Sequence, residues 1–285
     1  MLTRLPFCPK YGGFILPPND SGAHFGVLFW HRDGFSTACG HGIIALGYWA
    51  VANGLIERKP NGTTDIVIDV PSGRVVARAD FNSDGDVKHV DFINVTSYQV
   101  SKANTLTVNL SGKQTPISYD LSFAGAVYAC VNAEDLNLKI EPSNHRAFIE
   151  LAGQIKAQCT DFLYLDKYYL YGVIFFEEKG ETADAIVQSN VTVYAEGAID
   201  RSPCGSGTCA RLAVLLAQGR VSEEKGLVHE SIIGTRFEAY VVERAPSESE
   251  FPACIPRVRG KARLVGNMNF FIDPSDPVYP GFVFS

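Results

Sequence analysis

The chain has 285 residues, of which 46% are hydrophobic and 20% charged, and its formal net charge is −6 at pH 7. This acidic balance argues against a nucleic-acid partner, and no apolar run approaches the ~20 residues that span a membrane. The stretch MLTRLPFCPK lacks the apolar core of a secretory signal, and seven cysteines without CxxC pairs indicate free thiols in a reducing compartment. We therefore expect a cytoplasmic globular protein with one large or two modest domains.

Strand patterns dominate the first part of the chain. Runs of β-branched and apolar residues, bounded by Gly, Pro, Asn and Asp, predict strands at 25–30, 65–70, 74–79 and 87–95. The sequence NSDGD at 82–86 predicts the hairpin turn before the last of them. Residues 96–113 are more polar, include a turn at Ser111 and Gly112, and mark the expected crossing into a second half.

The second half has strand patterns of its own, which lie at 116–121, 126–131, 162–165, 169–176 and 191–195. Residues 144–157 predict an amphipathic helix, because Phe148, Leu151 and Ile155 fall on one face. The sequence APSESEFP at 245–252 predicts a loop.

One short element occurs twice and is the strongest signal in the chain. Residues 39–54 read CGHGIIALGYWAVANG, and residues 204–219 read CGSGTCARLAVLLAQG. Each copy opens Cys-Gly-x-Gly and continues as an apolar run, which predicts buried helices at 43–53 and 208–218. Each ends on a glycine that suits the C′ position of a helix. A strand-rich half around one buried helix, repeated once, predicts an α+β fold with two pseudo-symmetric halves.

This spacing places Cys39 and Cys204 at or just before a helix N-terminus. The unsatisfied N–H groups and the helix dipole there favour a thiolate, lower the pKa of the thiol and can also hold a carboxylate. A single CGxG motif is explained equally well by a buried structural cysteine in a tight turn. The second copy favours a site where two halves meet, with one acid and one base on opposite sides of a substrate.

The chain resembles the proline racemase family, which includes hydroxyproline 2-epimerases and trans-3-hydroxy-L-proline dehydratases. The resembling stretches are FGVLFWHRDGFSTACGHGIIALG, DLSFAGAVYACVNA, AIDRSPCGSGTCAR, ESIIGTRFEAYV and IPRVRGKARLVGNMNFFIDPSDP. The resemblance covers most of the chain and implies a fold like that of diaminopimelate epimerase. The active site then lies in the cleft between halves and needs no cofactor. The first half is expected at 1–100, with 268–285 returning to it, and the second half at 101–267.

The resemblance also assigns roles to individual residues. Cys39 and Cys204 are the implied catalytic pair for a small cyclic amino acid. The motif match implies that the substrate carboxylate is held by Gly40, His41, Gly205 and Ser206. Asp200 matches the family residue that holds the ring ammonium, the alternative being an Asx turn into the tight loop. The His41 side chain is either an extra acid or contact, or a space-filling group.

Other reactive side chains are predicted to be structural. Cys204 and Cys209 lack the second pair that a zinc site needs, so no metal is expected. Cys130 and Cys209 lie in apolar runs and are predicted to pack in the core. The same surface or core role is predicted for His24, His31, His89, His145 and His229. Tyr164, Tyr168, Tyr169 and Tyr171 are predicted to be core or hairpin residues, of which one could line the ring pocket.

The substrate stays open within the family. Dehydratases of this type have Thr in place of the second Cys, so Cys204 favours racemisation or epimerisation of proline or a hydroxyproline. The 4-hydroxyproline epimerases carry a pocket His in the strand that here reads YLYGVIFF, at 169–176, without one. That strand and Arg211 resemble the dehydratase branch, in which Cys39 removes the α-proton and the 3-hydroxyl leaves.

The chain starts later than the usual pattern of the family, and it reads Phe7-Cys8-Pro9-Lys10 where the family has an Arg-Gly-His stretch. Missing strands would leave an unpaired sheet edge, so a truncated, inactive member is a third interpretation. It predicts weaker protection from hydrogen exchange at 25–44 than at 191–216. The oligomeric state stays open, with a homodimer as one option.

Overall fold

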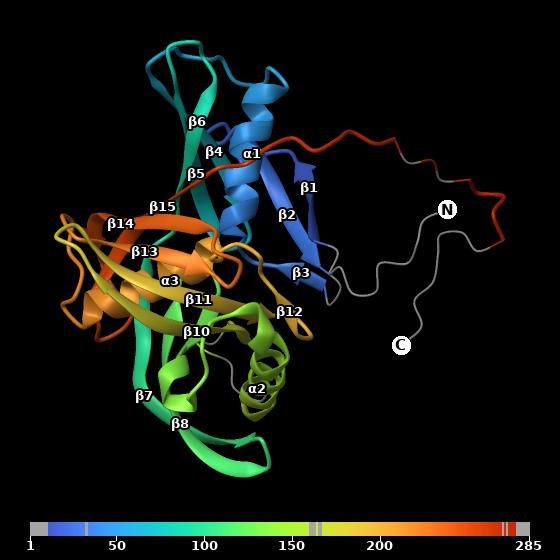
Figure 1. Cartoon of the computed structure of the whole chain (residues 1–285). Helices are drawn as coiled ribbons and strands as arrows, with labels where there is room; N and C mark the ends of the chain where they lie inside the picture. Colours follow the sequence, from blue (N-terminus) through green and yellow to red (C-terminus); the bar gives the residue numbers. More distant parts are fainter. Residues whose placement is uncertain are drawn as a thin grey trace.

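The computed structural model describes residues 11–31, 34–159, 164, 167–269, 271 and 273–277. Within them, strands form one sheet in the order β1-β2-β4-β5-β6-β15-β14-β13-β11-β10-β9-β8-β7, with β3 and β12 attached at its sides. Figure 1 shows that this sheet curls around the helices instead of lying flat. None of the described helices is long and apolar enough to cross a membrane.

The first group of elements surrounds one helix. The strands are β1 (Tyr11–Leu16), β2 (Phe25–His31), β3 (Gly34–Ser36), β4 (Thr63–Val70), β5 (Gly73–Phe81) and β6 (Val87–Ile93). Helix α1 (Gly40–Ala52) packs on β5 and β6. A Cβ at Gly47 would lie 2.9 Å from the side chains of Ala77 and Val90, so this glycine lets the helix approach the sheet closely.

The second group surrounds two helices, α2 (His145–Gln158) and α3 (Gly205–Ala217). Its strands are β7 (Ser97–Leu110), β8 (Lys113–Phe123), β9 (Val127–Asn132), β10 (Leu170–Glu181), β11 (Ala185–Tyr194), β12 (Ala198–Ile199), β13 (Gly226–Ser231), β14 (Arg236–Ala245) and β15 (Ala253–Gly260). Two 3₁₀ turns, η1 (Ala133–Leu136) and η2 (Pro142–Asn144), precede α2. Strand β15 joins the groups, because it pairs antiparallel with both β6 and β7.

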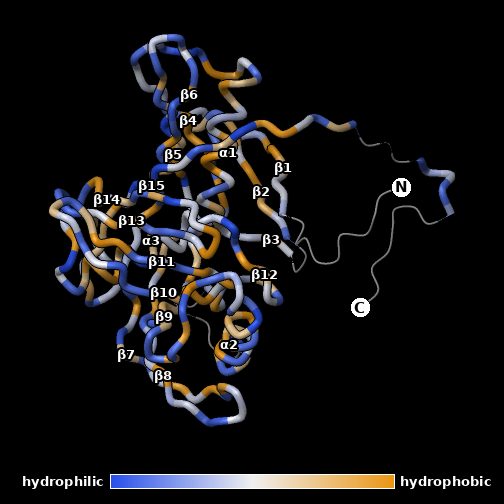
Figure 2. Tube along the Cα trace, viewed as in Figure 1, coloured by the Kyte–Doolittle hydropathy of each residue, from blue (hydrophilic) through white to orange (hydrophobic). Residues whose placement is uncertain are grey.

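Two hydrophobic cores hold these layers together. One core runs from the first group into α3, so Ile43, Phe92 and Leu212 belong to the same cluster. The other core lies between α2 and the strands β7 to β11, with Phe148 and Phe175 in ring contact at 5.0 Å. Figure 2 shows apolar and hydrophilic residues alternating along α2 and along the strands. The position of α3 inside the first core brings its N-terminus to that of α1.

Most elements expected from the sequence are confirmed, including the turn at 82–86, the α2 helix and the glycine stops. Gly54 and Gly219 have φ of 69° and 70°, the left-handed conformation of the C′ position. Both duplicated helices begin three residues earlier than expected, because their Gly-x-Gly segments are already helical. The buried-helix prediction is correct for α3, in which Gly205 to Leu216 are all buried. It is wrong for α1, where Ala45 and Ala52 are exposed.

Other expectations need correction. Most of the polar stretch 96–113 is strand β7, which was not expected and which pairs with β8 through the expected turn at Ser111 and Gly112. Strand β1 and strands β13 to β15 were not expected, although the start of β14 alternates exposed and buried residues as a half-buried strand does. Cys8 and most of 162–165 lie outside the described residues. Of 268–285, the structure describes 268, 269, 271 and 273–277, and none of these forms a strand.

Candidate active site

The two cysteines of the duplicated element occupy equivalent positions. Cys39 is the N-cap of α1 and Cys204 is the N-cap of α3. The Gly42 N–H donates to Cys39 Sγ at 3.3 Å, and the Gly207 N–H donates to Cys204 Sγ at 3.4 Å. Each sulfur therefore takes the place that a Ser or Asp oxygen usually takes at a helix start.

The first residues of α1 and α3, Gly40 and Gly205, are in close contact, so the N-terminal ends of the two helices meet. A Cβ at Gly40 would lie 2.7 Å from Gly205 Cα, and a Cβ at Gly205 would lie 2.6 Å from Gly40 Cα. Only glycine fits this approach on both sides, because the neighbouring atoms are backbone. The positive ends of two helix dipoles consequently converge on one place, which favours an anion there.

Both thiols line one small pocket of about 10 Å³, which is room for roughly one water molecule. The lining residues are Tyr11, Ala38, Cys39, Gly40, His41, Tyr128, Tyr171, Tyr194, Asp200, Cys204 and Ser206. The structure thus brings together every residue that the sequence assigned to the site except Gly205, which faces Gly40 behind the pocket. A ligand larger than water requires the surrounding side chains to move.

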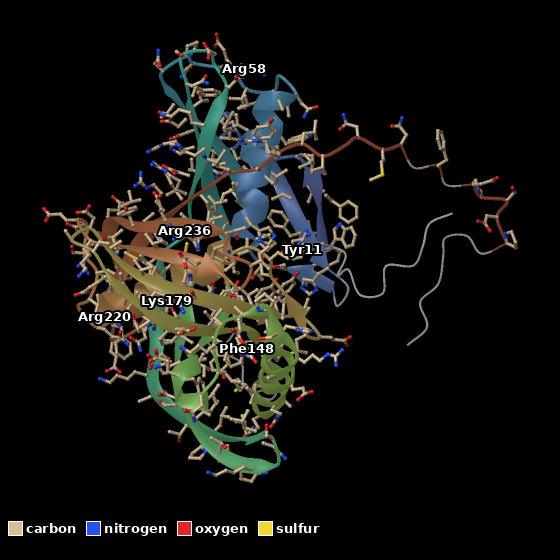
Figure 3. All side chains as sticks on the ribbon, viewed as in Figure 1. Tyr11, Arg58, Phe148, Lys179, Arg220 and Arg236 are labelled. Atoms are coloured by element: carbon tan, nitrogen blue, oxygen red, sulfur yellow. The ribbon has the colours of Figure 1, made fainter. Side chains whose placement is uncertain are left out.

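Four tyrosines form the walls of this pocket, and three of them were not predicted from the sequence. Tyr171, which was anticipated as one option, stacks on Tyr194 at 6.1 Å and 12°. Tyr11 meets Tyr194 edge-on, and Figure 3 shows Tyr11 near the junction of the two groups of elements. The Tyr128 hydroxyl lies 2.7 Å from Ser206 Oγ and 3.9 Å from Cys204 Sγ. No local motif marks these positions, since their rings converge only through strand packing.

The phenol groups stay protonated at neutral pH. Burial raises the pKa of Tyr194 to about 12, and it also raises the pKa of Tyr11, Tyr128 and Tyr171. In each case burial is the largest cause. The pocket therefore presents hydroxyl donors beside both thiols.

His41 and Asp200 form an ion pair across the pocket. His41 Nδ1 lies 3.0 Å from Asp200 Oδ2, with the two side chains 34% and 8% exposed. Burial acts to lower the pKa of His41, but Asp200 and then Cys39 raise it well above its ordinary value. Burial acts to raise the pKa of Asp200, but His41 and Ser202 hold it below its ordinary value.

The two carboxylate oxygens of Asp200 have different partners. The Ser202 N–H and hydroxyl both donate to Asp200 Oδ1, at 2.8 and 2.9 Å, which is the Asx turn proposed as the structural alternative. The other oxygen of the carboxylate meets His41 and faces the pocket. The imidazole of His41 thus takes the place next to Asp200 that a substrate ammonium would need.

One electrostatic expectation is wrong for Cys204. Its position at a helix N-terminus predicted a lowered thiol pKa, yet burial, followed by the charge of Asp200, raises the pKa of Cys204 to about 12. The His41 charge and the Gly207 N–H oppose this rise without overcoming it. Cys204 is therefore a protonated thiol at neutral pH.

Replacing Asp200 by Asn is expected to reveal the ion pair through its pH dependence. The raised pKa of His41 gives stability that is complete below 6.5 and lost as pH rises through the folded value. The lowered pKa of Asp200 gives stability that is complete above 3.8 and lost as pH falls through the folded value. The Tm difference between wild type and Asp200→Asn should therefore be largest between pH 3.8 and 6.5 and shrink at alkaline pH, as measured by thermal denaturation.

The matched control is Asp65→Asn, which breaks the surface pair between Asp65 and Arg78. Arginine stays charged in the same alkaline range, so the control should show no such loss of its Tm difference. A pH-independent difference for Asp200→Asn would contradict a charged His41.

Cys130, Cys209 and His229 are buried but do not line the pocket of the two N-cap thiols. Cys130 and Cys209 pack in the core as expected, and this burial raises the pKa of both thiols, that of Cys130 to about 12. His229 is also buried, and it has a partner from a distant segment, Thr208. In the part of the chain that the structure describes, no three His, Cys, Asp or Glu side chains are arranged to hold a metal ion.

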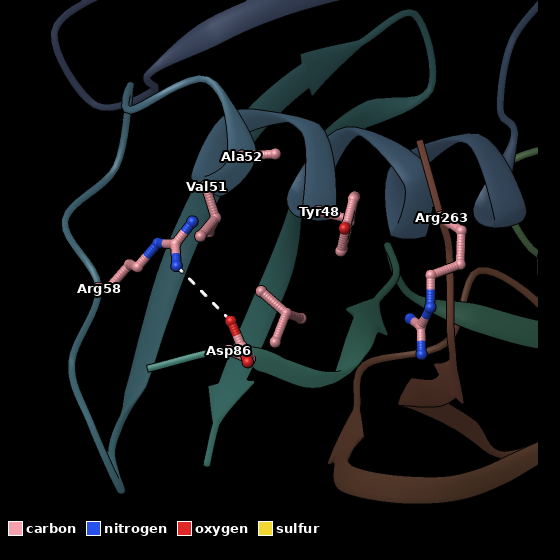
Figure 4. A pocket seen from close by; sticks show the side chains of 7 residues that line it. Tyr48, Val51, Ala52, Arg58, Asp86 and Arg263 are labelled. Carbon is pink, nitrogen blue, oxygen red and sulfur yellow. Dashed lines mark ion pairs between the residues drawn. The ribbon is translucent and has the colours of Figure 1, made fainter. Parts of the chain in front are cut away.

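A larger hollow of about 340 Å³ lies along the outer side of α1 (Figure 4). It is lined by Tyr48, Val51, Ala52, Arg58, Asp86, Val87 and Arg263. Arg58 and Asp86 pair across it at 3.7 Å, both on exposed side chains. Its lining contains neither of the two N-cap thiols and none of the residues that the sequence assigned to the site.

Comparisons with known proteins point to one family. A sequence model of the family described as "Proline racemase" matches residues 9–283. A trans-3-hydroxy-L-proline dehydratase of Bacillus thuringiensis subsp. konkukian is 35% identical over 96% of this chain and 81% of its own. A proline racemase of Clostridioides difficile is 32% identical over 96% and 81%. Among solved structures, a hydroxyproline epimerase from Agrobacterium vitis with bound trans-4-hydroxy-L-proline gives a TM-score of 0.84 at 27% identity, covering 95% of this chain and 77% of that one. The α+β fold expected from the sequence is confirmed by this likeness.

Proposed function

Because this chain belongs to the proline racemase family, whose named relatives are enzymes, we propose that it is a cofactor-independent racemase or epimerase that inverts the α-carbon of proline or a hydroxyproline. The observation that carries the proposal is the pair of N-cap thiols, Cys39 and Cys204, on one pocket between facing helix ends. In this proposal the halves 1–100 and 101–267 each supply one thiol.

The reaction needs one proton removed and one returned on the opposite face. One cysteine, as thiolate, takes the α-proton, and the other, as thiol, gives its proton to the other face of the α-carbon. Each turnover takes one proton from the α-carbon and returns one, so the protons balance. The two cysteines exchange roles when the substrate has the other hand.

The helix ends supply the groups that hold the substrate carboxylate. The first intrahelical bonds run from Ile43 N–H to the Cys39 carbonyl and from Thr208 N–H to the Cys204 carbonyl. The N–H groups before them, on Gly40, His41, Gly205 and Ser206, therefore point out of the helix starts. They can bind a carboxylate and stabilise the negative charge that develops on it when the α-proton leaves.

The charges around the thiols suggest which one acts first as base. Cys204 is held as a thiol by burial and Asp200, whereas the charge of His41 interacts favourably with Cys39. A thiolate at Cys39 is thus balanced by a neighbouring positive charge. We infer that Cys39 acts as the base and Cys204 as the acid for one hand of the substrate.

The second candidate is trans-3-hydroxy-L-proline dehydratase, favoured by the hydroxyl groups of Tyr128 and Ser206 on the Cys204 side. Cys39 would take the α-proton, the bond between Cβ and the 3-hydroxyl would break, and a proton from the Cys204 side would release that oxygen as water. Tyr128 and Ser206 can hydrogen bond a leaving hydroxyl, whereas the ring of plain proline offers them no partner.

One experiment separates these functions. The protein is incubated in D₂O with L-proline, trans-4-hydroxy-L-proline or trans-3-hydroxy-L-proline, and the α-proton is followed by NMR. Loss of the α-proton signal with appearance of the other hand supports racemisation or epimerisation. Loss of the 3-hydroxyl with formation of a ring imine supports the dehydratase. No α-exchange with any of the three, with or without EDTA in the buffer, would contradict both.

A further inference from the structure

The main chain at Cys204 has an unusual conformation that its duplicate lacks. Cys204 has φ 64° and ψ 112°, whereas Cys39 has φ −152° and ψ 94°. A positive φ with this ψ is rarely adopted by a residue with a side chain, so the surroundings must hold it. Cys39 lies in the extended region and needs no such restraint.

The restraint on this loop acts through the carbonyl of Pro203. Asn190 Nδ2 donates to the Pro203 carbonyl at 2.8 Å, and Thr208 Oγ1 donates to the same oxygen at 3.1 Å. Asn190 and Thr208 are both fully buried. The peptide that enters Cys204 is therefore fixed from β11 on one side and from α3 on the other.

His229 on β13 completes this arrangement. Its Nδ1 lies 3.0 Å from Thr208 Oγ1, and its side chain is fully buried. Because the single hydroxyl proton of Thr208 goes to Pro203, His229 must donate from Nδ1 to the Thr208 oxygen. His229 is then a neutral imidazole with its proton on Nδ1, while Nε2 has no protein partner.

The electrostatics of the neighbourhood keep His229 neutral. Burial, and then the charge of Arg211, lower the pKa of His229 to about 3. Arg211 is itself buried one turn along α3 from Thr208, where it donates to Gln188 and stacks 3.5 Å above the Phe176 ring. A stable Nδ1–H donor toward Thr208 is therefore maintained over the neutral and alkaline range.

The first copy of the element has no counterpart to this network. Position 208 corresponds to Ile43 and position 211 to Leu46, both apolar. The carbonyl before Cys39, that of Ala38, accepts instead from the nearby Ser36 hydroxyl at 2.7 Å. The polar support is thus specific to the Cys204 side of the pocket.

We propose that Thr208 and His229 are positioning residues, which hold the strained peptide at Pro203 and Cys204 so that the Cys204 thiol stays at the start of α3 and faces the pocket. The proposal rests on the proposed role of Cys204, but its main test needs no substrate. It explains why a buried histidine with an unpartnered nitrogen is present beside a catalytic helix.

The test is iodoacetamide labelling of each cysteine, resolved by mass spectrometry of the peptides and repeated from neutral to alkaline pH. The groups that face the Cys204 thiol are Asp200, His41 and Tyr128, and all three are retained in the variants. In Thr208→Val and His229→Leu the loop relaxes and the thiol gains water. The pH midpoint of Cys204 labelling should then fall toward that of a free thiol, because burial is the main cause of its elevation. The labelling of Cys39 should stay as in the wild type.

The conservative variants and a matched control complete the design. Thr208→Ser and His229→Asn keep a hydroxyl and an N–H donor in place, so both should restore the wild-type Cys204 profile. Thr64→Val makes the same substitution at a buried hydroxyl oxygen without a hydrogen-bond partner, and it should change neither cysteine. With a substrate that turns over, Thr208→Val should lower kcat about tenfold and leave KM nearly unchanged, because a misplaced acid slows proton transfer more than binding.

Equal changes at Cys39 and Cys204 in Thr208→Val would indicate general loosening and overturn the proposal, as would an unchanged Cys204 profile. If no proline derivative reacts but Cys204 shifts alone, the proposed function fails while the positioning role stands.

Discussion

Replacing Cys39 or Cys204 by serine is expected to lower racemisation or epimerisation by roughly 10²- to 10⁴-fold, the range that a positioned acid or base contributes. Serine keeps the shape and the N-cap hydrogen bond of each cysteine, but a hydroxyl is a far weaker acid than a thiol. The folded structure should therefore persist, as judged by circular dichroism and Tm. Turnover with each hand of the substrate is the measurement.

Cys130→Ser is the matched control, since it makes the same change at a buried thiol outside the pocket. A buried hydroxyl without a partner costs about 1–3 kcal/mol, so the control should lose stability but keep its kcat. Near-full activity of either Cys39→Ser or Cys204→Ser would rule out the two-base mechanism. A large loss only at Cys39 would favour the dehydratase, in which Cys204 is less important.

Replacing Gly205 by alanine is expected to lower activity about hundredfold, because the two helix ends must separate and displacements of about 1 Å at a reacting centre have such effects. The added Cβ would lie 2.6 Å from Gly40 Cα and 2.8 Å from the backbone nitrogen of His41. Both are backbone atoms, which cannot rotate away as a side chain can. The separation moves both thiols and both sets of helix N–H groups at once. Activity and Tm of Gly205→Ala should fall together.

Gly153→Ala provides the comparison within the same chain. Gly153 lies in α2, and a Cβ there would meet nothing within 4 Å. Alanine should therefore stabilise this helix by about 0.5–1 kcal/mol and leave turnover unchanged. If Gly205→Ala behaved like Gly153→Ala, the close contact of the helix ends would not be needed for the site.

The His41–Asp200 pair occupies a carboxylate oxygen that was expected to bind the substrate. Asp200 was expected to hold a substrate ammonium, but in this structure its Oδ2 atom pairs with His41 Nδ1. The pocket is also no larger than a water molecule. Substrate binding in the proposed mechanism must therefore displace the His41 ring and move tyrosine side chains, so binding and the charge state of His41 are coupled.

Features that depend on a few neighbouring residues could be predicted from the sequence. Cys-Gly-x-Gly followed by an apolar run and a glycine specifies an N-cap, a helix and a C′ stop, and both copies form these elements. The repetition of this element indicated two thiols on one site, because such a pattern has no local structural need. Strand runs and the α2 helix were equally readable, since hydrophobic periodicity is local information.

Which distant side chains meet at those thiols depends on the tertiary structure and could not be predicted from the sequence. Tyr11, Tyr128 and Tyr194 reach the pocket from three strands, and their convergence depends on sheet order and register, which no short stretch encodes. The pairing of His229 with Thr208 has the same origin, because β13 and α3 pack only in the finished core. The pKa of Cys204 was predicted in the wrong direction for a related reason. The helix N-terminus can be read from the sequence, but the burial that outweighs it is a property of the whole fold.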